Sequence, residues 1–352
     1  MPRLCRLLII GICSVIFFVA CGDFLEGDRS FNSLEGDKPS AAEYCRLVEH
    51  QVGKTEVCGQ PQNVAVISPY LLDTMLALGV QPAAFAQAVN PRIQIFDNPT
   101  EQIPYVGKWV TSNPIGLGSR NTPSLERLTL LKPDLILGES WQGNQYDLMT
   151  QIAPTLMFSD QKNPDRVLSW EQNIVEVAQA LGRAEKVEDL RAAHAAQIAQ
   201  ARAALQPVLQ AYPRVFLMSS NVGLTQPKSG SDTSLLRLLQ EIGFEIVPPP
   251  GFTGSRVPLS LEVIPEIESD LMFVAGWDDD LALNPEESTP EATVQGTWKS
   301  RPVLNTMPVF QLGRVFFVDY YLWGGVVRGP LSDQIILEAL PDLLLPVVEN
   351  PT

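Results

Sequence analysis

The sequence predicts an α/β fold in which two Rossmann-like lobes with mainly parallel sheets are joined by one long α-helix. Short apolar runs alternate with helical segments before residue 183, and the alternation restarts after residue 211, a pattern typical of parallel sheets covered by helices. Between them, residues 184–205 contain no Gly or Pro and are rich in Ala, Glu, Arg and Gln, which favours a single helix. Because such sheets bind ligands outside the carboxyl ends of their strands, the ligand cleft is expected between the lobes.

The chain divides into five predicted parts. These are a signal peptide (1–20), a flexible tether (21–40), an N-terminal α/β lobe (41–183), a connecting helix (184–210) and a C-terminal α/β lobe (211–352). In the first lobe we expect strands at 63–68, 134–138 and 155–158, and helices at 71–78, after Ser124 and at 145–152. Gly79 ends the first of these helices.

The second lobe repeats the alternation. We expect strands at 214–220, 245–247, 270–275 and 315–319, and helices at 233–242 and 332–345. Gly243 ends the first of these two helices.

A short motif occurs once in each lobe. Ser124-Leu125-Glu126 and Ser260-Leu261-Glu262 are each followed, after seven residues, by an Asp-Leu pair that opens an apolar strand. The spacing indicates two equivalent halves, each with one carboxylate at the same place, which suits a twofold partner. Each Ser is a plausible helix N-cap. Pro265 removes a hydrogen bond from the second helix, which is expected to be short or kinked.

The N-terminus has the features of a lipoprotein signal. Arg3 and Arg6 precede an uncharged apolar run at 7–20, which is short for a membrane span and suits a signal-peptide core. The run ends in Phe-Val-Ala-Cys, which resembles a bacterial lipobox, so Cys21 is predicted to be the lipidated first residue and to attach the protein to a membrane. The alternative is an ordinary secretory signal with a chance cysteine.

Charge and cysteine content limit the possible partners. The chain has 25 basic and 40 acidic residues and no basic cluster, which argues against nucleic acid and suits a soluble monomer. Cys45 and Cys58 form an even pair around residues 46–57, an expected hairpin that turns at Val52-Gly53, and an oxidising compartment favours their disulfide. Two free thiols are the alternative.

The sequence lacks the patterns of a metal centre or an enzyme. His50 and His194 are the two histidines, and no Cys, His or Glu cluster has metal-ligand spacing, so a metal would arrive already chelated and no resident cofactor is expected. No G-x-S-x-G elbow or dinucleotide fingerprint occurs. These absences argue against an enzyme.

Several motifs follow one another in an order typical of one family. They are VAVISPY (64–70), ALGV (77–80), PSLE (123–126), LKPDLI (131–136), ALGR (180–183), the hairpin with His50 and Gly53, and the ending Trp323-Gly324-Gly325…Gly329-Pro330. In these the chain resembles the helix-linked substrate-binding proteins of ABC importers for iron–siderophores, haem and cobalamin. The resemblance implies that Glu126 and Glu262 dock into arginine pockets of a permease dimer, which works with an ATPase.

The resemblance also implies a ligand site. Arg120 lies six residues before Glu126, where hydroxamate-siderophore binding proteins carry an arginine that contacts ligand oxygens, and it is the leading ligand residue. Trp141 and Trp277 follow strands at equivalent positions and are expected to line the cleft. The second-rank candidates are Tyr70, Ser219, Ser220, Tyr321, Trp323 and Arg328.

The expected ligand is a ferric siderophore, of the hydroxamate or citrate type. Guanidinium groups bind its oxygens and aromatic faces pack on its organic skeleton. Cobalamin and haem are alternatives, with Tyr70 or Tyr321 as an axial haem ligand. A structural or sensor lipoprotein is a third possibility and would need no cleft arginine.

Overall fold

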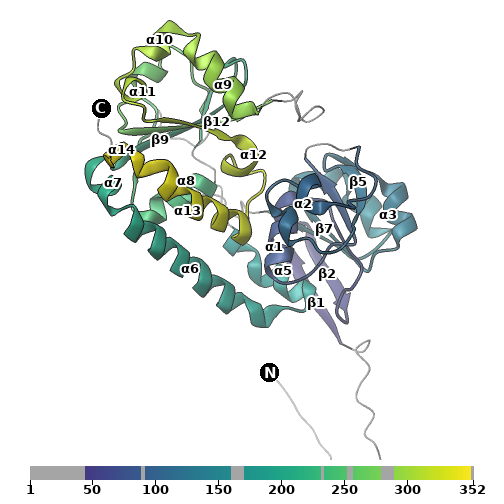
Figure 1. The fold of residues 1–352 in the computed structure, drawn as a ribbon. Coiled ribbons are helices and arrows are strands. Elements are labelled where there is room, and N and C mark those ends of the chain that lie inside the picture. Colours follow the sequence, from purple (N-terminus) through teal and green to yellow (C-terminus); the bar gives the residue numbers. More distant parts are fainter. Residues whose placement is uncertain are drawn as a thin grey trace, which may run out of the picture. The chain divides into compact units, whose positions relative to one another are not determined.

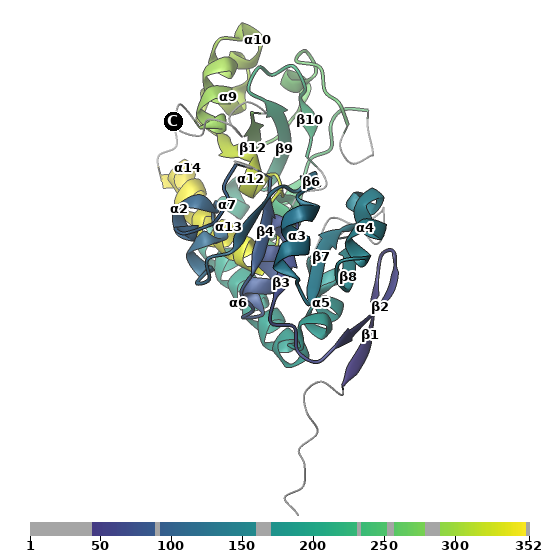
Figure 2. The same cartoon turned by 90° about the vertical axis from the view of Figure 1, so that its right-hand side faces the viewer.

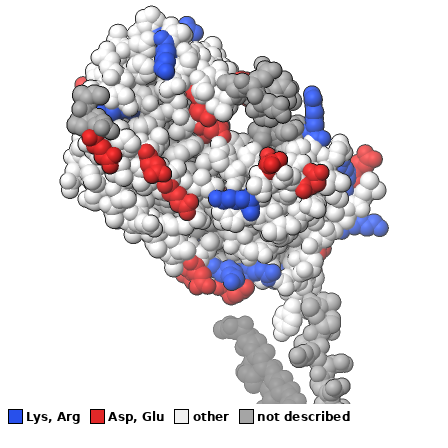
Figure 3. Space-filling view, in the orientation of Figure 1, with Lys and Arg blue, Asp and Glu red and all other residues white. Residues whose placement is uncertain are grey.

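A computed structural model describes residues 44–88, 92–159, 170–230, 234–251, 257–278 and 289–349. The predicted signal peptide, Cys21 and tether lie outside this range. No helix among the described residues is long and apolar enough to cross a membrane. On the face shown in Figure 3, basic side chains are scattered among acidic ones rather than gathered in one patch.

The N-terminal lobe is built on a six-stranded sheet of order β6-β5-β4-β3-β7-β8. Its strands are β3 (Val64–Val66), β4 (Ala84–Gln87), β5 (Ile115–Ser119), β6 (Thr122–Pro123), β7 (Leu135–Glu139) and β8 (Thr155–Phe158). All neighbours are parallel except β5 and β6. The central strands are continuously buried, as expected for a parallel sheet with helices on both faces.

Alternating side chains of these strands pack into two separate cores. Val64, Val66 and Leu135 face one core with helices α1 (Pro69–Ala77) and α5 (Ile174–Leu181), whereas Ala65 and Ile136 face the other with α3 (Leu125–Leu131) and α4 (Tyr146–Thr150). This is the two-residue period of a strand. Figure 2 shows α3 and α4 on the viewer's side of the sheet. The short elements α2 (Pro99–Gln102), η1 (Val106–Trp109), η2 (Ser140–Gln145) and η3 (Trp170–Gln172) connect the strands.

The C-terminal lobe has a second sheet of order β10-β9-β12-β13, with β11 also paired to β9. Its strands are β9 (Arg214–Asn221), β10 (Lys228–Ser229), β11 (Glu245–Ile246), β12 (Leu271–Trp277) and β13 (Val315–Asp319). The helices are α8 (Ser234–Ile242), α9 (Pro290–Lys299), α10 (Pro302–Asn305), α11 (Pro308–Gln311), α12 (Tyr320–Trp323), α13 (Pro330–Leu344) and α14 (Pro346–Glu349). The structure therefore confirms the predicted class of two α/β lobes with mainly parallel sheets.

The second half of the sequence repeat has the same structural role in both lobes. The side chain of Asp134, just before β7, accepts hydrogen bonds from the backbone of Asn63, at 3.0 Å, and Gln62, at 2.7 Å, before β3. Asp270, just before β12, accepts one from the backbone of Arg214, the first residue of β9, at 2.9 Å. In each lobe, therefore, the aspartate satisfies backbone N–H groups at the start of the neighbouring strand, which explains the repeated Asp-Leu pair.

The first half of the repeat is less symmetric. Ser124 caps α3, and its hydroxyl accepts a hydrogen bond from the backbone of Arg127 at 3.3 Å. After Ser260 the chain forms turns and a single 3₁₀ turn, η5 (Ile264–Glu266), instead of an α-helix. The expectation of a second capped α-helix was therefore wrong, and Pro265 inside η5 gives the physical reason.

The connection between the lobes is a helix with a break. A 3₁₀ turn, η4 (Ala184–Lys186), precedes α6 (Val187–Ala204), and α7 (Gln206–Ala211) follows. The predicted uninterrupted helix over 184–205 is thus shorter, because its first turn is 3₁₀ and a new helix, with Pro207 in its first turn, begins at Gln206. Figure 1 shows α6 running between the lobes with α13 beside it.

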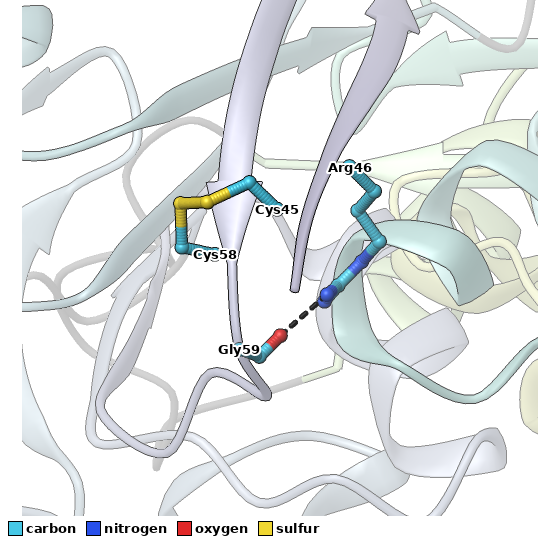
Figure 4. The surroundings of a disulfide bond; sticks show 4 residues. All are labelled: Cys45, Arg46, Cys58 and Gly59. Atoms are coloured by element: carbon cyan, nitrogen blue, oxygen red, sulfur yellow. Dashed lines mark hydrogen bonds between the residues drawn. A yellow bond between two sulfur atoms is a disulfide. The ribbon is translucent and has the colours of Figure 1, made fainter. Parts of the chain in front are cut away.

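The N-terminal hairpin consists of β1 (Cys45–His50) and β2 (Gly53–Cys58), and a disulfide joins Cys45 to Cys58 at its open end. Arg46 fixes the hairpin to the end of α5, because its guanidinium donates to the carbonyls of Gln179, at 2.5 Å, and Ala180, at 2.7 Å. It also donates to Gly59 (Figure 4). The predicted hairpin is confirmed, but its two turn residues are Gln51 and Val52, one position before the expected turn at Val52-Gly53.

A buried carboxylate links the first helix to the last long one. Asp73 of α1 accepts hydrogen bonds from the backbone N–H groups of Leu331, at 2.9 Å, and Ser332, at 2.8 Å, in the first turn of α13. Asp73 is fully buried. Gly329 lies so close that a Cβ there would meet the Asp73 side chain at 2.4 Å. This contact ties α13 of the C-terminal lobe to the N-terminal lobe.

We predict that Asp73 makes the stability of the protein depend on pH. Burial raises the pKa of Asp73 from 3.8 to about 7, although the hydrogen bonds from Leu331 and Ser332 act in the opposite direction. Because the folded-state pKa lies above the unfolded one, this contribution to stability is complete below about pH 4 and is lost as the pH rises through about 7. Between these values the free energy of unfolding should fall by up to about 1.4 kcal/mol per pH unit.

Urea unfolding of the wild type and of Asp73→Asn, followed by tryptophan fluorescence from pH 4 to 8, measures this term. We expect the difference in free energy of unfolding between the two proteins to change with pH over this range. Two parallel pH profiles would show that Asp73 does not titrate there.

Candidate ligand-binding site

Polar side chains stand where three parallel strands of the N-terminal sheet end. Ser68 follows β3, Arg120 follows β5, and Glu139 is the last residue of β7. The carboxyl ends of parallel strands meet at one edge of a sheet, where α/β proteins bind ligands. The backbone N–H of Arg120 also donates to the carbonyl of Gln87, the last residue of β4, at 2.9 Å. The strand order therefore brings together residues that are far apart in the sequence.

Glu139 is the centre of this group and is 2% exposed. The hydroxyl of Ser68 donates to its Oε1 at 2.7 Å, and its backbone N–H donates to Oε1 of Gln142 at 2.7 Å. The Gln142 amide donates in turn to the carbonyl oxygens of Ile67, at 3.1 Å, and Arg120, at 2.5 Å. Gln142 thus fixes the three strand ends relative to one another.

Two arginines approach the Glu139 carboxylate from different parts of the chain. Nη2 of Arg328 donates to Oε2, and Nη1 of Arg120 lies 3.6 Å from Oε1. Burial raises the pKa of Glu139, but the charges of Arg328 and Arg120 and the hydrogen bond from Ser68 more than offset this effect, so that the pKa lies below its ordinary value. Glu139 is therefore an ionised carboxylate at neutral pH.

Arg120 and Trp141 form a cation–aromatic pair at this edge. The Arg120 guanidinium lies 5.4 Å from the centre of the Trp141 ring, within the range of a cation–π contact. Trp141 is 51% exposed and the Arg120 side chain 22% exposed. Both predicted ligand residues are therefore adjacent, and both keep surface for a ligand.

Tyr321 reaches the same place from the C-terminal lobe. Burial raises its pKa and the charge of Arg120 acts against this rise, so the two groups interact. Its ring stacks on Tyr105 with centroids 6.1 Å apart. Its hydroxyl is buried and has no hydrogen-bond partner within the described part of the chain. A buried hydroxyl of this kind is suited to accept a polar group of a ligand.

A second contact crosses between the lobes nearby. The Tyr105 hydroxyl donates to Oδ2 of Asp319, the last residue of β13, at 2.5 Å. Burial raises the pKa of both groups, and the charge of Asp319 raises that of Tyr105 further. Two strand-end carboxylates, Asp319 and Glu139, thus each bond a loop residue of the other lobe, Tyr105 and Arg328 respectively.

The other strand-end candidates lie together in the C-terminal lobe. Trp277 ends β12, and its ring lies 5.3 Å from that of Tyr320 and 6.0 Å from Nζ of Lys228. Lys228 pairs with Ser219 in the β9–β10 ladder. Ser219 is buried, and its neighbour Ser220 is fully buried. Trp277 thus has a cationic neighbour, as Trp141 does, and an aromatic one in addition.

Tyr70 and Trp323, the remaining aromatic candidates, lie in the core of this structure. Tyr70 is fully buried, its hydroxyl accepts a hydrogen bond from Asn173 at 3.1 Å, and its ring lies 5.0 Å from the Arg328 guanidinium. Trp323 is buried and stacks on Phe273 at 6.2 Å. Tyr70 lies in α1 and Trp323 in α12, and both side chains point toward the sheet. The sequence positions did not indicate this orientation.

Four residues of this region were missed by sequence reasoning, namely Glu139, Gln142, Tyr105 and Lys228. Glu139 had one usable signal, because it is a charged residue that directly ends an apolar strand. Gln142 had a local signal as well, because it forms a capping box with Glu139, three residues earlier. Tyr105 is bonded to Asp319, 214 residues later, and no local pattern marks Tyr105 or Lys228. Among the described residues, Cys45, Glu56 and Cys58 are the one group placed to hold a metal, and its two thiols form the disulfide.

The repeated glutamates are both exposed. Glu126 lies in the first turn of α3, where a carboxylate meets the positive end of the helix dipole. Glu262 lies in the turn that precedes η5. Neither side chain belongs to the group around Glu139, so their predicted role in docking is compatible with a ligand bound elsewhere.

Two α/β lobes joined by a helix, with polar groups at facing strand ends, define a two-lobed solute-binding protein. A family model described as periplasmic binding protein matches residues 64–322, and the chain belongs to this family. This membership confirms the predicted resemblance and the expectation that the protein is not an enzyme.

Known proteins are similar over most of the chain. The Fe(3+)-citrate-binding protein YfmC of Bacillus subtilis is 25% identical over 326 residues, 90% of each chain. The crystal structure of Staphylococcus aureus SirA complexed with staphyloferrin B has a TM-score of 0.66 at 21% identity and covers 85% of this chain and 98% of its own. The iron uptake ABC transporter substrate-binding protein PiuA of Streptococcus pneumoniae has a TM-score of 0.60 at 20% identity, with coverage of 84% and 96%.

Proposed function

We propose that the protein captures a ferric siderophore outside the cytoplasm and delivers it to an ABC importer. The observation that carries the proposal is the pair of Arg120 and Trp141, held at the carboxyl edge of the N-terminal sheet and both partly exposed. The guanidinium can donate to carboxylate, hydroxamate or catecholate oxygens, and the indole can pack against an organic skeleton. The iron is the cargo and arrives already chelated.

The relatives support an iron chelate as the ligand class. YfmC is named for ferric citrate and SirA was crystallised with staphyloferrin B. Between the two predicted types, a carboxylate chelate of the citrate kind is favoured, because a doubly hydrogen-bonding guanidinium matches a carboxylate. Trp277, Tyr321 and Ser219 complete the proposed site from the second lobe, and Arg328 supports it by its contact with Glu139.

The remaining proposals concern where the protein works and with what. Cys21 carries the lipid that anchors it to the membrane, and residues 21–40 act as the tether. Glu126 and Glu262, which are exposed, dock on the permease dimer that works with its ATPase. The protein binds its ligand as a monomer, in keeping with its net charge of −15.

A fluorescence titration of the purified protein tests the ligand class. Six tryptophans are present, and Trp141 and Trp277 lie at the proposed site. We expect saturable quenching by ferric citrate or a ferric hydroxamate, and little response to haemin, cobalamin or iron-free citrate. Absence of quenching by ferric citrate, a ferric hydroxamate and a ferric catecholate alike would contradict the proposal, and saturable binding of haemin or cobalamin would replace it.

A further inference from the structure

We propose that Glu139 is a specificity-determining residue that sets how strongly the site prefers anionic over neutral ferric chelates. The inference rests on the proposed function, in which the chelate contacts Arg120. Glu139 itself is 2% exposed and does not touch the ligand. It acts through the charge that it places beside Arg120.

The geometry gives the two arginines different roles. Arg328 is joined to Oε2 of Glu139 by a direct hydrogen bond, and its side chain is largely buried, with a second hydrogen bond to the carbonyl of Gly325 at 2.7 Å. Arg120 lies 3.6 Å from Oε1, which is longer than a hydrogen bond, and it is the more exposed of the two. Arg328 therefore compensates the carboxylate, whereas Arg120 is left able to turn to a ligand.

This arrangement lets Arg120 engage a ligand at little cost. When its guanidinium turns to a chelate oxygen, the Glu139 carboxylate still accepts hydrogen bonds from Arg328 and from Ser68, at 2.7 Å. The buried Glu139 charge therefore stays compensated. An uncompensated buried charge would be strongly unfavourable. The Ser68 and Arg328 contacts thus hold the carboxylate in place in both situations.

The same carboxylate limits the attraction of the site for anions. It is an ionised group in a partly buried place, where charges interact over several ångströms with little screening. Within this cluster its negative charge offsets one of two guanidinium charges. The affinity for a neutral chelate does not depend on this charge. A chelate that carries negative charge is bound less tightly than it would be by the two arginines without Glu139.

Glu139→Gln and Arg328→Gln test the inference by changing the cluster charge in opposite directions. The measured quantity is the ratio of the Kd of ferrichrome, a neutral trihydroxamate, to the Kd of ferric dicitrate, an anionic chelate. We expect Glu139→Gln to raise this ratio roughly tenfold and Arg328→Gln to lower it by a similar factor. The double variant restores the original cluster charge and should return the ratio to within about threefold of the wild type.

Two controls separate charge from structural damage. Glu139→Asp keeps the charge and should keep the ratio, even where both chelates bind more weakly. Thermal unfolding establishes which variants are folded. If one of the two single variants does not fold, the other single variant and the double variant still give the sign of the change in the Kd ratio. If only the charge-retaining and double variants fold, their ratios must both stay at the wild-type value.

The outcomes distinguish this inference from the proposed function. If the wild type binds neither chelate nor any other ferric chelate, the proposed function fails. If the wild type binds but both single variants shift the ratio in the same direction, or leave it within twofold, the role of Glu139 in specificity is overturned while the ligand class stands. A salt titration adds a readout that loss of packing would not change, because the affinity for ferric dicitrate should become more salt-dependent in Glu139→Gln.

Discussion

Arg120→Ala is expected to weaken the binding of a ferric carboxylate or hydroxamate chelate by on the order of 30- to 150-fold. This corresponds to roughly 2–3 kcal/mol, the contribution of a hydrogen bond to a charged group at a partly buried site. The structure leaves the Arg120 side chain 22% exposed, with its guanidinium beside the ring of Trp141, a residue that is itself exposed. Isothermal titration or quenching of tryptophan fluorescence measures the change in Kd.

The controls for this prediction are a change at a second arginine and a conservative change at Arg120. Arg191→Ala removes a charge from the exposed face of α6, where Arg191 pairs with Glu188, and should leave the Kd unchanged. Arg120→Lys keeps the charge but loses the planar fork, so its Kd should lie between those of the wild type and Arg120→Ala. An unchanged Kd in Arg120→Ala, with the variant folded, would place the ligand away from the Arg120 edge of the sheet.

The fold was predictable from the sequence because its strands are buried on both faces. Parallel strands covered by helices are continuous apolar runs, and β3, β7, β9 and β12 all have that form. The Asp-Leu repeat was also informative for a local reason. Asp134 and Asp270 each satisfy backbone groups at the start of the adjacent strand, so an equivalent pair of strands required an equivalent aspartate.

The candidate site was predictable only in part, because side-chain direction is set by distant contacts. Arg120, Trp141 and Trp277 follow strands, and the edge of a sheet is accessible, so position alone located them. Tyr70 lies as close to a strand end, but the first turn of α1 points its side chain into the core. There Asn173, 103 residues later in the sequence, donates a hydrogen bond to the Tyr70 hydroxyl. Glu139 and Arg328 are separated by 189 residues, and no local pattern connects them.

Alanine substitutions at the proposed docking residues, Glu126 and Glu262, are expected to affect uptake and not ligand affinity. Replacing both Glu126 and Glu262 with alanine should leave the Kd for the ferric chelate within about twofold of the wild type, because both carboxylates are exposed and neither belongs to the group around Glu139. Uptake of labelled iron, in cells whose sole copy of the protein is the variant, should fall to the background level. Two charged contacts with a partner, each typically important for recognition, are lost together.

A matched charge change makes this second prediction specific. Glu185→Ala with Glu188→Ala removes two exposed carboxylates from the start of the connecting helix and should leave uptake unchanged, so that net charge alone cannot explain a loss.

The single variants, Glu126→Ala and Glu262→Ala, test whether the two halves of the repeat are still equivalent. If Glu126 on its α-helix and Glu262 on its turn serve equivalent pockets, each single change should reduce uptake to a similar degree despite their different backbones. A loss in Glu126→Ala alone would mean that the turn introduced by Pro265 has taken Glu262 out of the docking surface, and a fall in ligand affinity in the double variant would instead assign the carboxylates to the ligand site.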